Sequence, residues 1–138
     1  MVAVNQLFED HGLRVDSVEV YGHPVTVKKW LTRDEYDLFV STITEHMKEF
    51  YGESEFLAFR LLWRMNIINF YTYLCLDSFA DNLLEFAYES GLYEKIIGAN
   101  GEHPLINMAQ YNEMLEDIKD ALKPHWEMES SDRMIRFM

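Results

Sequence analysis

Cysteine is almost absent from this chain of 138 residues, in which Cys75 is the only one. A single cysteine excludes an internal disulfide framework and is consistent with a reducing compartment. Its neighbours Leu74 and Leu76 are apolar and disfavour the reactive thiolate. We therefore expect a packed structural cysteine rather than a nucleophile.

Basic residues are also scarce. The chain has 12 lysines and arginines against 24 aspartates and glutamates, which gives a net charge of −12. Such a charge repels nucleic-acid phosphates and anionic membranes, so direct binding to DNA, RNA or a lipid surface is disfavoured. It favours solubility, or a partner with a basic surface.

Long uninterrupted hydrophobic runs are missing. The first residues, MVAVNQLFEDHGL, lack the charged start and long apolar stretch of a signal peptide. Residues 56–76 are long and apolar enough to suggest a membrane span, but Arg60, Arg64, Asn66 and Asn69 interrupt them. Such residues are costly in hydrocarbon, so we predict a core helix in a soluble protein.

Apolar and aromatic residues, by contrast, are plentiful. They make up 49% and 14% of the chain, enough for a dense core, and the length suits one domain. Their spacing predicts a mainly α fold, a compact bundle of four to five helices with an N-terminal β-hairpin at about residues 14–30. This domain covers residues 1–124, and residues 125–138 form a hydrophobic C-terminal tail.

The first third of the chain contains the hairpin signal. Residues 2–11 fit a short amphipathic helix. Valines then alternate with polar residues over 18–27, around a Gly-His-Pro turn signal at 22–24. Lys28 and Lys29 follow at the hairpin edge, where lysine blunts unwanted strand pairing.

A capped helix is predicted next. Thr32 stands three residues before Glu35, the capping-box spacing in which each side chain satisfies an exposed backbone N–H. Apolar residues then recur at three- and four-residue steps until Gly52 can end the helix. Trp30 and Leu31, just before the cap, are expected to anchor the start of this helix in the core.

From residue 54 onward the domain is predicted to be mainly helical. Residues 54–75 are apolar nearly all round, as in a central helix, although residues 67–76 also fit a buried strand. Asp77 is a suitable N-cap for a third long helix to about residue 90, and a short helical turn follows. Asn107 resembles another cap, before a final amphipathic helix that Pro124 is expected to stop.

The sequence contains no pattern that indicates a reaction. The five histidines lack the His-Glu-x-x-His and helical Glu-x-x-His spacings of metal sites. The Gly-Ala-Asn-Gly loop at 98–101 lacks the Gly-Lys-Ser/Thr ending of a phosphate loop and follows no clear strand. We predict no enzyme activity, catalytic residue, metal or cofactor.

The tail differs in character from the rest. It carries apolar residues with no obvious place in the preceding core, namely Trp126, Met128, Met134, Ile135, Phe137 and Met138. Methionine and aromatic residues are frequent at adaptable interfaces. Two interpretations stay open: the tail folds back on its own domain, or a partner holds it.

Three stretches carry a family resemblance. VTVKKWLTRDEYDLFVSTI (residues 25–43), a β-run with a lysine-containing turn into a capped acidic helix, resembles the start of small phage proteins encoded among virion-assembly genes. FYTYLCLDSFADNLLEFAYESGLYEKIIG (70–98) is similar to their middle section, and QYNEMLEDIKDAL (110–122) to their last helix.

This resemblance covers about residues 18–122. It implies a tail-assembly chaperone or a related head–tail protein, located in the host cytoplasm or the virion, with no catalytic residue to carry over. The chain departs from the group's pattern in its N-terminal helix, in Thr32 where a proline is usual, and in its hydrophobic tail.

We therefore expect a non-enzymatic phage protein that acts in virion assembly, as a chaperone or a structural protein, through protein–protein contacts. Its partner is a phage structural protein or a second copy of the chain. The predicted partner-binding residues are Lys28, Lys29, Trp126, Met128, Met134, Ile135 and Phe137. The alternative is an acidic inhibitor, whose helix faces mimic a row of phosphates and block a host nucleic-acid-binding enzyme.

Overall fold

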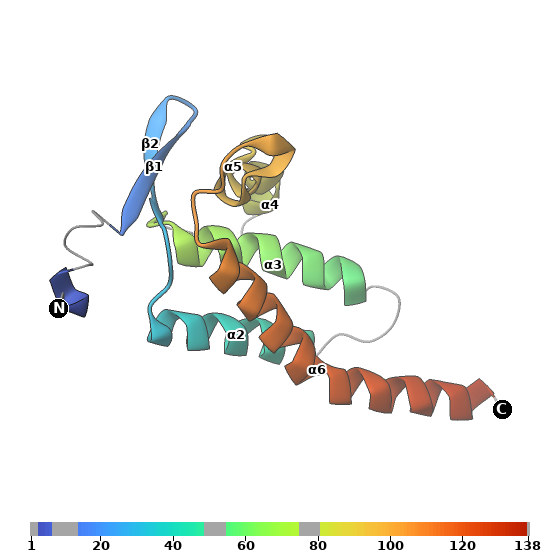
Figure 1. Cartoon of the computed structure of the whole chain (residues 1–138). Helices are drawn as coiled ribbons and strands as arrows, with labels where there is room; N and C mark the ends of the chain where they lie inside the picture. Colours follow the sequence, from blue (N-terminus) through green and yellow to red (C-terminus); the bar gives the residue numbers. More distant parts are fainter. Residues whose placement is uncertain (1–2, 7–13, 49–54, 75–80, 138) are drawn as a thin grey trace.

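The computed structural model describes residues 3–6, 14–48, 55–74 and 81–137. A helical turn at residues 4–6 precedes a two-stranded antiparallel hairpin of β1 (Val15–Val20) and β2 (His23–Lys28). The helices of the described part are α2 (Arg33–Met47), α3 (Glu55–Tyr71), α4 (Asp81–Glu89), α5 (Leu92–Ile97) and α6 (Met108–Phe137), with the short 3-10 helix η1 (Ala99–Gly101) before α6. The predicted mainly α fold with an N-terminal hairpin is therefore confirmed (Figure 1).

The hairpin turns one residue earlier than the sequence predicts. Tyr21 and Gly22 form a two-residue turn, and both have positive φ, at 52° and 79°. Positive φ at both central positions is the signature of the type I′ turn, whose twist matches that of the flanking strands. Pro24, assigned to the turn at 22–24 from sequence, instead lies in β2 opposite Glu19.

The hairpin packs on the helices through one face. Val20, Val25 and Val27 are buried, whereas the neighbouring Glu19 and Thr26 are exposed, so the predicted alternation is confirmed. A two-stranded hairpin alone is marginal in water, and this apolar face supplies the packing that it needs.

The segment that the sequence left open between helix and strand is helical as far as Tyr71. Helix α3 runs to Tyr71, and the next residue, Thr72, forms an antiparallel bridge with Val27 of β2. The Thr72 hydroxyl donates to the Ile68 carbonyl at 2.6 Å and accepts from the Leu74 N–H at 3.3 Å. One threonine thus turns the chain from the end of the helix toward the edge of the hairpin.

Aromatic side chains join α2, α3, α5 and α6 in the core. The rings of Phe39 and Trp63 meet edge to face, with centroids 5.3 Å apart. The Trp63 indole N–H donates to the hydroxyls of Tyr93 and Tyr111, at 3.2 and 3.0 Å. The polar tips of these large residues therefore find partners inside the protein, as burial requires.

Two of the three predicted N-caps are present. Thr32 and Glu35 form the complete capping box at the start of α2. At the start of α6, the Asn107 side-chain oxygen accepts from the Gln110 N–H at 3.1 Å. Helix α4 begins at Asp81, while the predicted N-cap Asp77 lies outside the described residues, as do Cys75, Gly52 and residues 7–11 of the predicted first helix.

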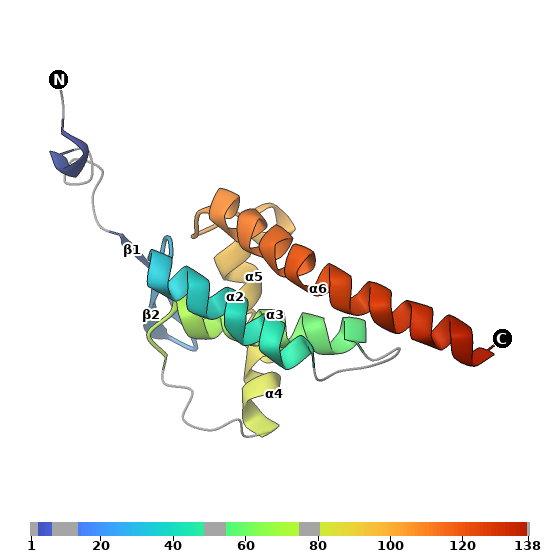
Figure 2. The ribbon, with the colours of Figure 1, turned by 90° about the horizontal axis from the view of Figure 1, so that it is seen from below.

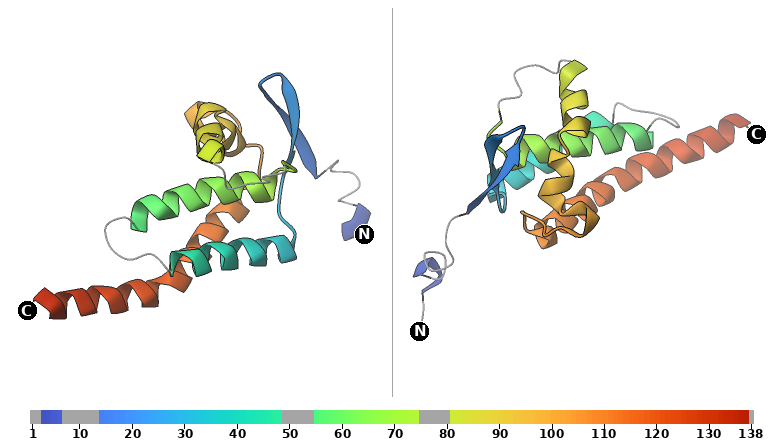
Figure 3. Two further views of the ribbon diagram at one scale, coloured as in Figure 1. Left: turned by 180° about the vertical axis from the view of Figure 1, so that it is seen from behind. Right: turned by 90° about the horizontal axis from the view of Figure 1, so that it is seen from above.

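The prediction that Pro124 stops the last helix is wrong. Helix α6 contains Pro124 and continues to Phe137. Proline removes one backbone hydrogen bond and crowds the preceding turn, but its own φ is helical, so a helix can pass through it at some cost. Beyond this exposed proline the helix points away from the bundle rather than folding back on it (Figures 2 and 3).

Candidate functional site

Helix α6 has a packed part and a projecting part. In the packed part, Met114, Ile118 and Leu122 are fully buried. We call residues 125–137 the α6 tail, whose backbone extends the helix away from α2 and α3 (Figure 2). Five of the seven predicted partner-binding residues belong to this tail: Trp126, Met128, Met134, Ile135 and Phe137.

The other two predicted residues, Lys28 and Lys29, lie far from the tail. The hairpin and the C-terminal end of α6 occupy opposite ends of the molecule in Figures 1 and 3. The two lysines and the tail therefore do not form one continuous surface, although the sequence alone suggested a shared binding surface.

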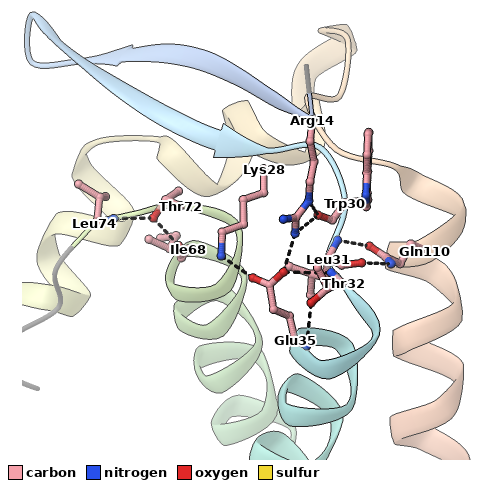
Figure 4. Close-up of polar contacts among 10 residues, drawn as sticks. All are labelled: Arg14, Lys28, Trp30, Leu31, Thr32, Glu35, Ile68, Thr72, Leu74 and Gln110. Carbon is pink, nitrogen blue, oxygen red and sulfur yellow. Dashed lines mark hydrogen bonds and ion pairs between the residues drawn. The ribbon is translucent and has the colours of Figure 1, made fainter. Parts of the chain in front are cut away.

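Lys28 has partners within its own chain. Its ammonium group lies 2.5 Å from a carboxylate oxygen of Glu35 (Figure 4). It also lies 4.8 Å from the centre of the Tyr73 ring, and the side chain is only 14% exposed. Lys29 is half-buried; its N–H donates to the Arg14 carbonyl, and its carbonyl accepts from the Asn107 N–H, both at 2.7 Å. Lys28 thus ties β2 to α2, which makes the α6 tail the stronger candidate for partner binding.

Glu35 is the centre of a polar group that we call the junction cluster: Arg14, Lys28, Thr32 and Glu35. Arg14 donates to the Glu35 carboxylate at 2.5 Å, and the Thr32 N–H donates to it at 3.0 Å. The same guanidinium also donates to the Trp30 carbonyl at 3.0 and 2.8 Å. Strand, connecting loop and helix are therefore joined at one carboxylate.

These contacts shift the titration of Glu35. Partial burial by itself raises the pKa of this carboxyl, but the hydrogen bonds from Lys28, Thr32 and Arg14 outweigh burial and lower the pKa to about 2. A general acid or base works best with a pKa near the operating pH. Glu35 is therefore suited to a structural role at the hairpin–helix junction rather than to proton transfer.

Only two members of the junction cluster, Thr32 and Glu35, are visible as a pair in the sequence. Thr32 and Glu35 are three residues apart and match a known local motif. Arg14 precedes Glu35 by 21 residues and carries no local signal, so its part in the cluster became visible only in the fold.

Carboxylates of α2 and α6 act on Tyr36 in a second polar feature, which we call the acidic seam: Asp37, Glu113 and Asp117. The Tyr36 hydroxyl donates to Asp117 across the two helices. The pKa of Tyr36 is raised, first by burial and then by its hydrogen bond to Asp117 and the negative charges of the three seam carboxylates. The acidic residues in the packed part of α6, all exposed, are Glu113, Glu116, Asp117 and Asp120.

The described part of the chain shows neither a metal site nor a membrane-spanning helix. There, no three histidine, cysteine, aspartate or glutamate side chains gather in an arrangement that would hold a metal ion. Among the helices described, none combines the length and apolar character needed to cross a bilayer.

Comparison with known proteins identifies no family. No family model matches the chain, and no curated protein or solved structure is detectably similar to it. The α6 tail, the junction cluster and the acidic seam are therefore the features from which a function is inferred.

Proposed function

We propose that the protein is a non-enzymatic binding module for phage virion assembly, either a chaperone or a structural component, and that the α6 tail is its binding element. The proposal is carried by the continuation of α6 through Pro124 into a helix that leaves the bundle (Figure 3). A short helix without packing partners has little stability in water. Contact with another polypeptide would supply the missing packing.

The composition of the tail supports this mode of binding. It combines Trp126 and Phe137 with two methionines and an isoleucine. Amphipathic helices are recognised when such residues enter an apolar groove of the partner, and aromatic and methionine side chains are favoured at such contacts.

The phage setting rests on the resemblance of residues 18–122 to virion-assembly proteins. The order of elements in that resemblance, a β-run, a lysine-containing turn and a capped acidic helix, corresponds here to β2, the bend at Lys29 and α2. This order supports the assignment to assembly without identifying the partner.

The test compares the full chain with a chain that ends at Pro124. Each is tagged and used to capture proteins from phage-infected cells, at low and at high salt. We expect the full chain to retain the same phage structural protein at both salt concentrations, because apolar contacts are little screened, and the shortened chain to lose it. Capture of that protein by the shortened chain would overturn the proposal.

The shortened chain needs its own folding control. Met114, Ile118 and Leu122 lie before the cut, so the packed part of α6 stays intact. We expect unchanged cooperative unfolding in urea, monitored by near-ultraviolet circular dichroism, so that lost binding reports on the tail and not on the core.

The acidic seam favours a second candidate function, inhibition of a nucleic-acid-binding enzyme. Carboxylates on two neighbouring helices would compete with phosphates for a basic groove. Binding of this kind weakens steeply as salt rises. Glu113→Gln with Asp117→Asn should abolish it, while leaving tail-dependent capture unchanged.

A further inference from the structure

Charge is unevenly distributed along the α6 tail. Its first half carries Glu127 and Glu129, whereas its second half carries Arg133 and Arg136, with Asp132 near the middle. Because the tail is helical, these residues succeed one another along one axis. The tail therefore has an acidic end next to the bundle and a basic end away from it.

The rest of the chain is strongly acidic. The tail holds three acidic and two basic residues, so almost all of the net charge of −12 lies in residues 1–124. Two copies of the chain therefore attract each other only in an arrangement that keeps these parts well separated.

From these two observations we propose that the α6 tail pairs with the α6 tail of a second copy in antiparallel alignment. The inference rests on the proposed function, since it names the partner of the same binding element. An alignment centred on Ser131 sets Glu129 level with Arg133 of the second copy, and Met128 level with Met134. Antiparallel packing also opposes the two helix dipoles.

Parallel pairing is disfavoured by the same charges. It would set Glu127 and Glu129 beside their own counterparts, and likewise the two arginines. It would also bring both acidic bundles to one end of the pair. Antiparallel pairing separates them by about the length of the tail, roughly 20 Å, which exceeds a Debye length of about 8 Å at physiological salt.

The test is the oligomeric state of charge-exchanged chains, measured by sedimentation equilibrium at physiological salt. We expect the unaltered chain to form a dimer. Glu127→Arg with Glu129→Arg makes the tail predominantly basic and should weaken the dimer at least about tenfold in Kd, since the two Glu129–Arg133 pairs of this alignment become repulsive and the two tails carry like charge. Adding Arg133→Glu and Arg136→Glu to the same chain reverses the polarity and should restore the dimer.

The control changes the same charges in another part of α6. Glu116→Arg with Asp120→Arg makes the same charge change on the exposed face of the packed part of α6, and should leave the dimer intact. A dimer that survives the first exchange, or is not restored by the second, would overturn antiparallel pairing. A monomeric unaltered chain would overturn this inference alone, because tail-dependent capture of another protein would still support the proposed function.

Discussion

Gln110 on α6 holds both backbone groups of Leu31, which lies 79 residues earlier in the chain. The Leu31 N–H donates to the amide oxygen of Gln110 at 2.7 Å, and the amide nitrogen donates to the Leu31 carbonyl at 3.0 Å (Figure 4). Leu31 is buried in the connection between β2 and α2. One side chain therefore fixes the last helix to the hairpin–helix junction.

Gln110→Ala should lower the free energy of unfolding by about 2 kcal/mol, because it leaves an N–H and a carbonyl in a partly buried place without these partners. Urea denaturation at neutral pH measures the change. Asn112→Ala, at an exposed position of the same helix, is the matched control. Equal midpoints for the two variants would show that the paired hydrogen bonds contribute nothing to stability.

Thr32→Ala should cost about 1 kcal/mol through loss of the N-cap. The Thr32 hydroxyl accepts the Glu35 N–H at 3.3 Å, and the Glu35 carboxylate accepts the Thr32 N–H at 3.0 Å. Thr32→Ser keeps the hydroxyl and should stay within a few tenths of a kcal/mol of the unaltered chain. An unchanged urea midpoint for the alanine variant would argue against the cap as a source of stability.

The capping box of Thr32 and Glu35 was predictable from the sequence, whereas the contact between Gln110 and Leu31 was not. The capping box joins residues three apart, so its spacing is visible in the sequence and its prediction is confirmed. The contacts Gln110–Leu31 and Arg14–Glu35 join residues 79 and 21 apart, and only the packed fold brings them together. Local chemistry was therefore predictable, whereas the contacts that join the elements were not.

The same reasoning applies to the ends of α3 and α6. The sequence left the first open and placed the second wrongly. Proline commonly ends helices, yet Pro124 lies within α6, because its local preference against the helix interior is not absolute. Residues 67–76 were predicted as part of a helix, with a buried strand as the alternative. The helix ends at Tyr71, and the next residue, Thr72, forms an isolated bridge with Val27. For the candidate site, sequence composition singled out the tail but not its direction away from the bundle.

Glu35 should make the stability of the protein depend on pH in acid. Its pKa is lowered from 4.5 to about 2 in the folded state, so its contribution is fully present above pH 4.5. That contribution is lost as the pH falls from about 4.5 to about 2. Since the side chain is 25% exposed, we take about 3 kcal/mol as the upper limit of the loss.

Glu35→Gln isolates this effect from that of other carboxyls. The difference in unfolding free energy between the unaltered chain and the variant should be largest at neutral pH and shrink steadily below about pH 4.5. Denaturation in urea across pH 2.5 to 7 measures it. A difference that stays constant over this range would contradict the lowered pKa.

Gly98→Ala should destabilise the protein by about 2 kcal/mol more than Gly101→Ala. Both glycines have positive φ, 74° and 84°, so each substitution carries backbone strain of about 1 kcal/mol. A Cβ at Gly98 would also lie 2.5 Å from the Pro104 nitrogen and 2.6 Å from the Glu102 carbonyl oxygen, whereas Gly101 has open space. Backbone atoms cannot rotate away, so overpacking adds to the strain only at Gly98. Urea denaturation of the two variants gives the comparison, and equal stabilities would rule out the close approach of the α5–α6 loop to Gly98.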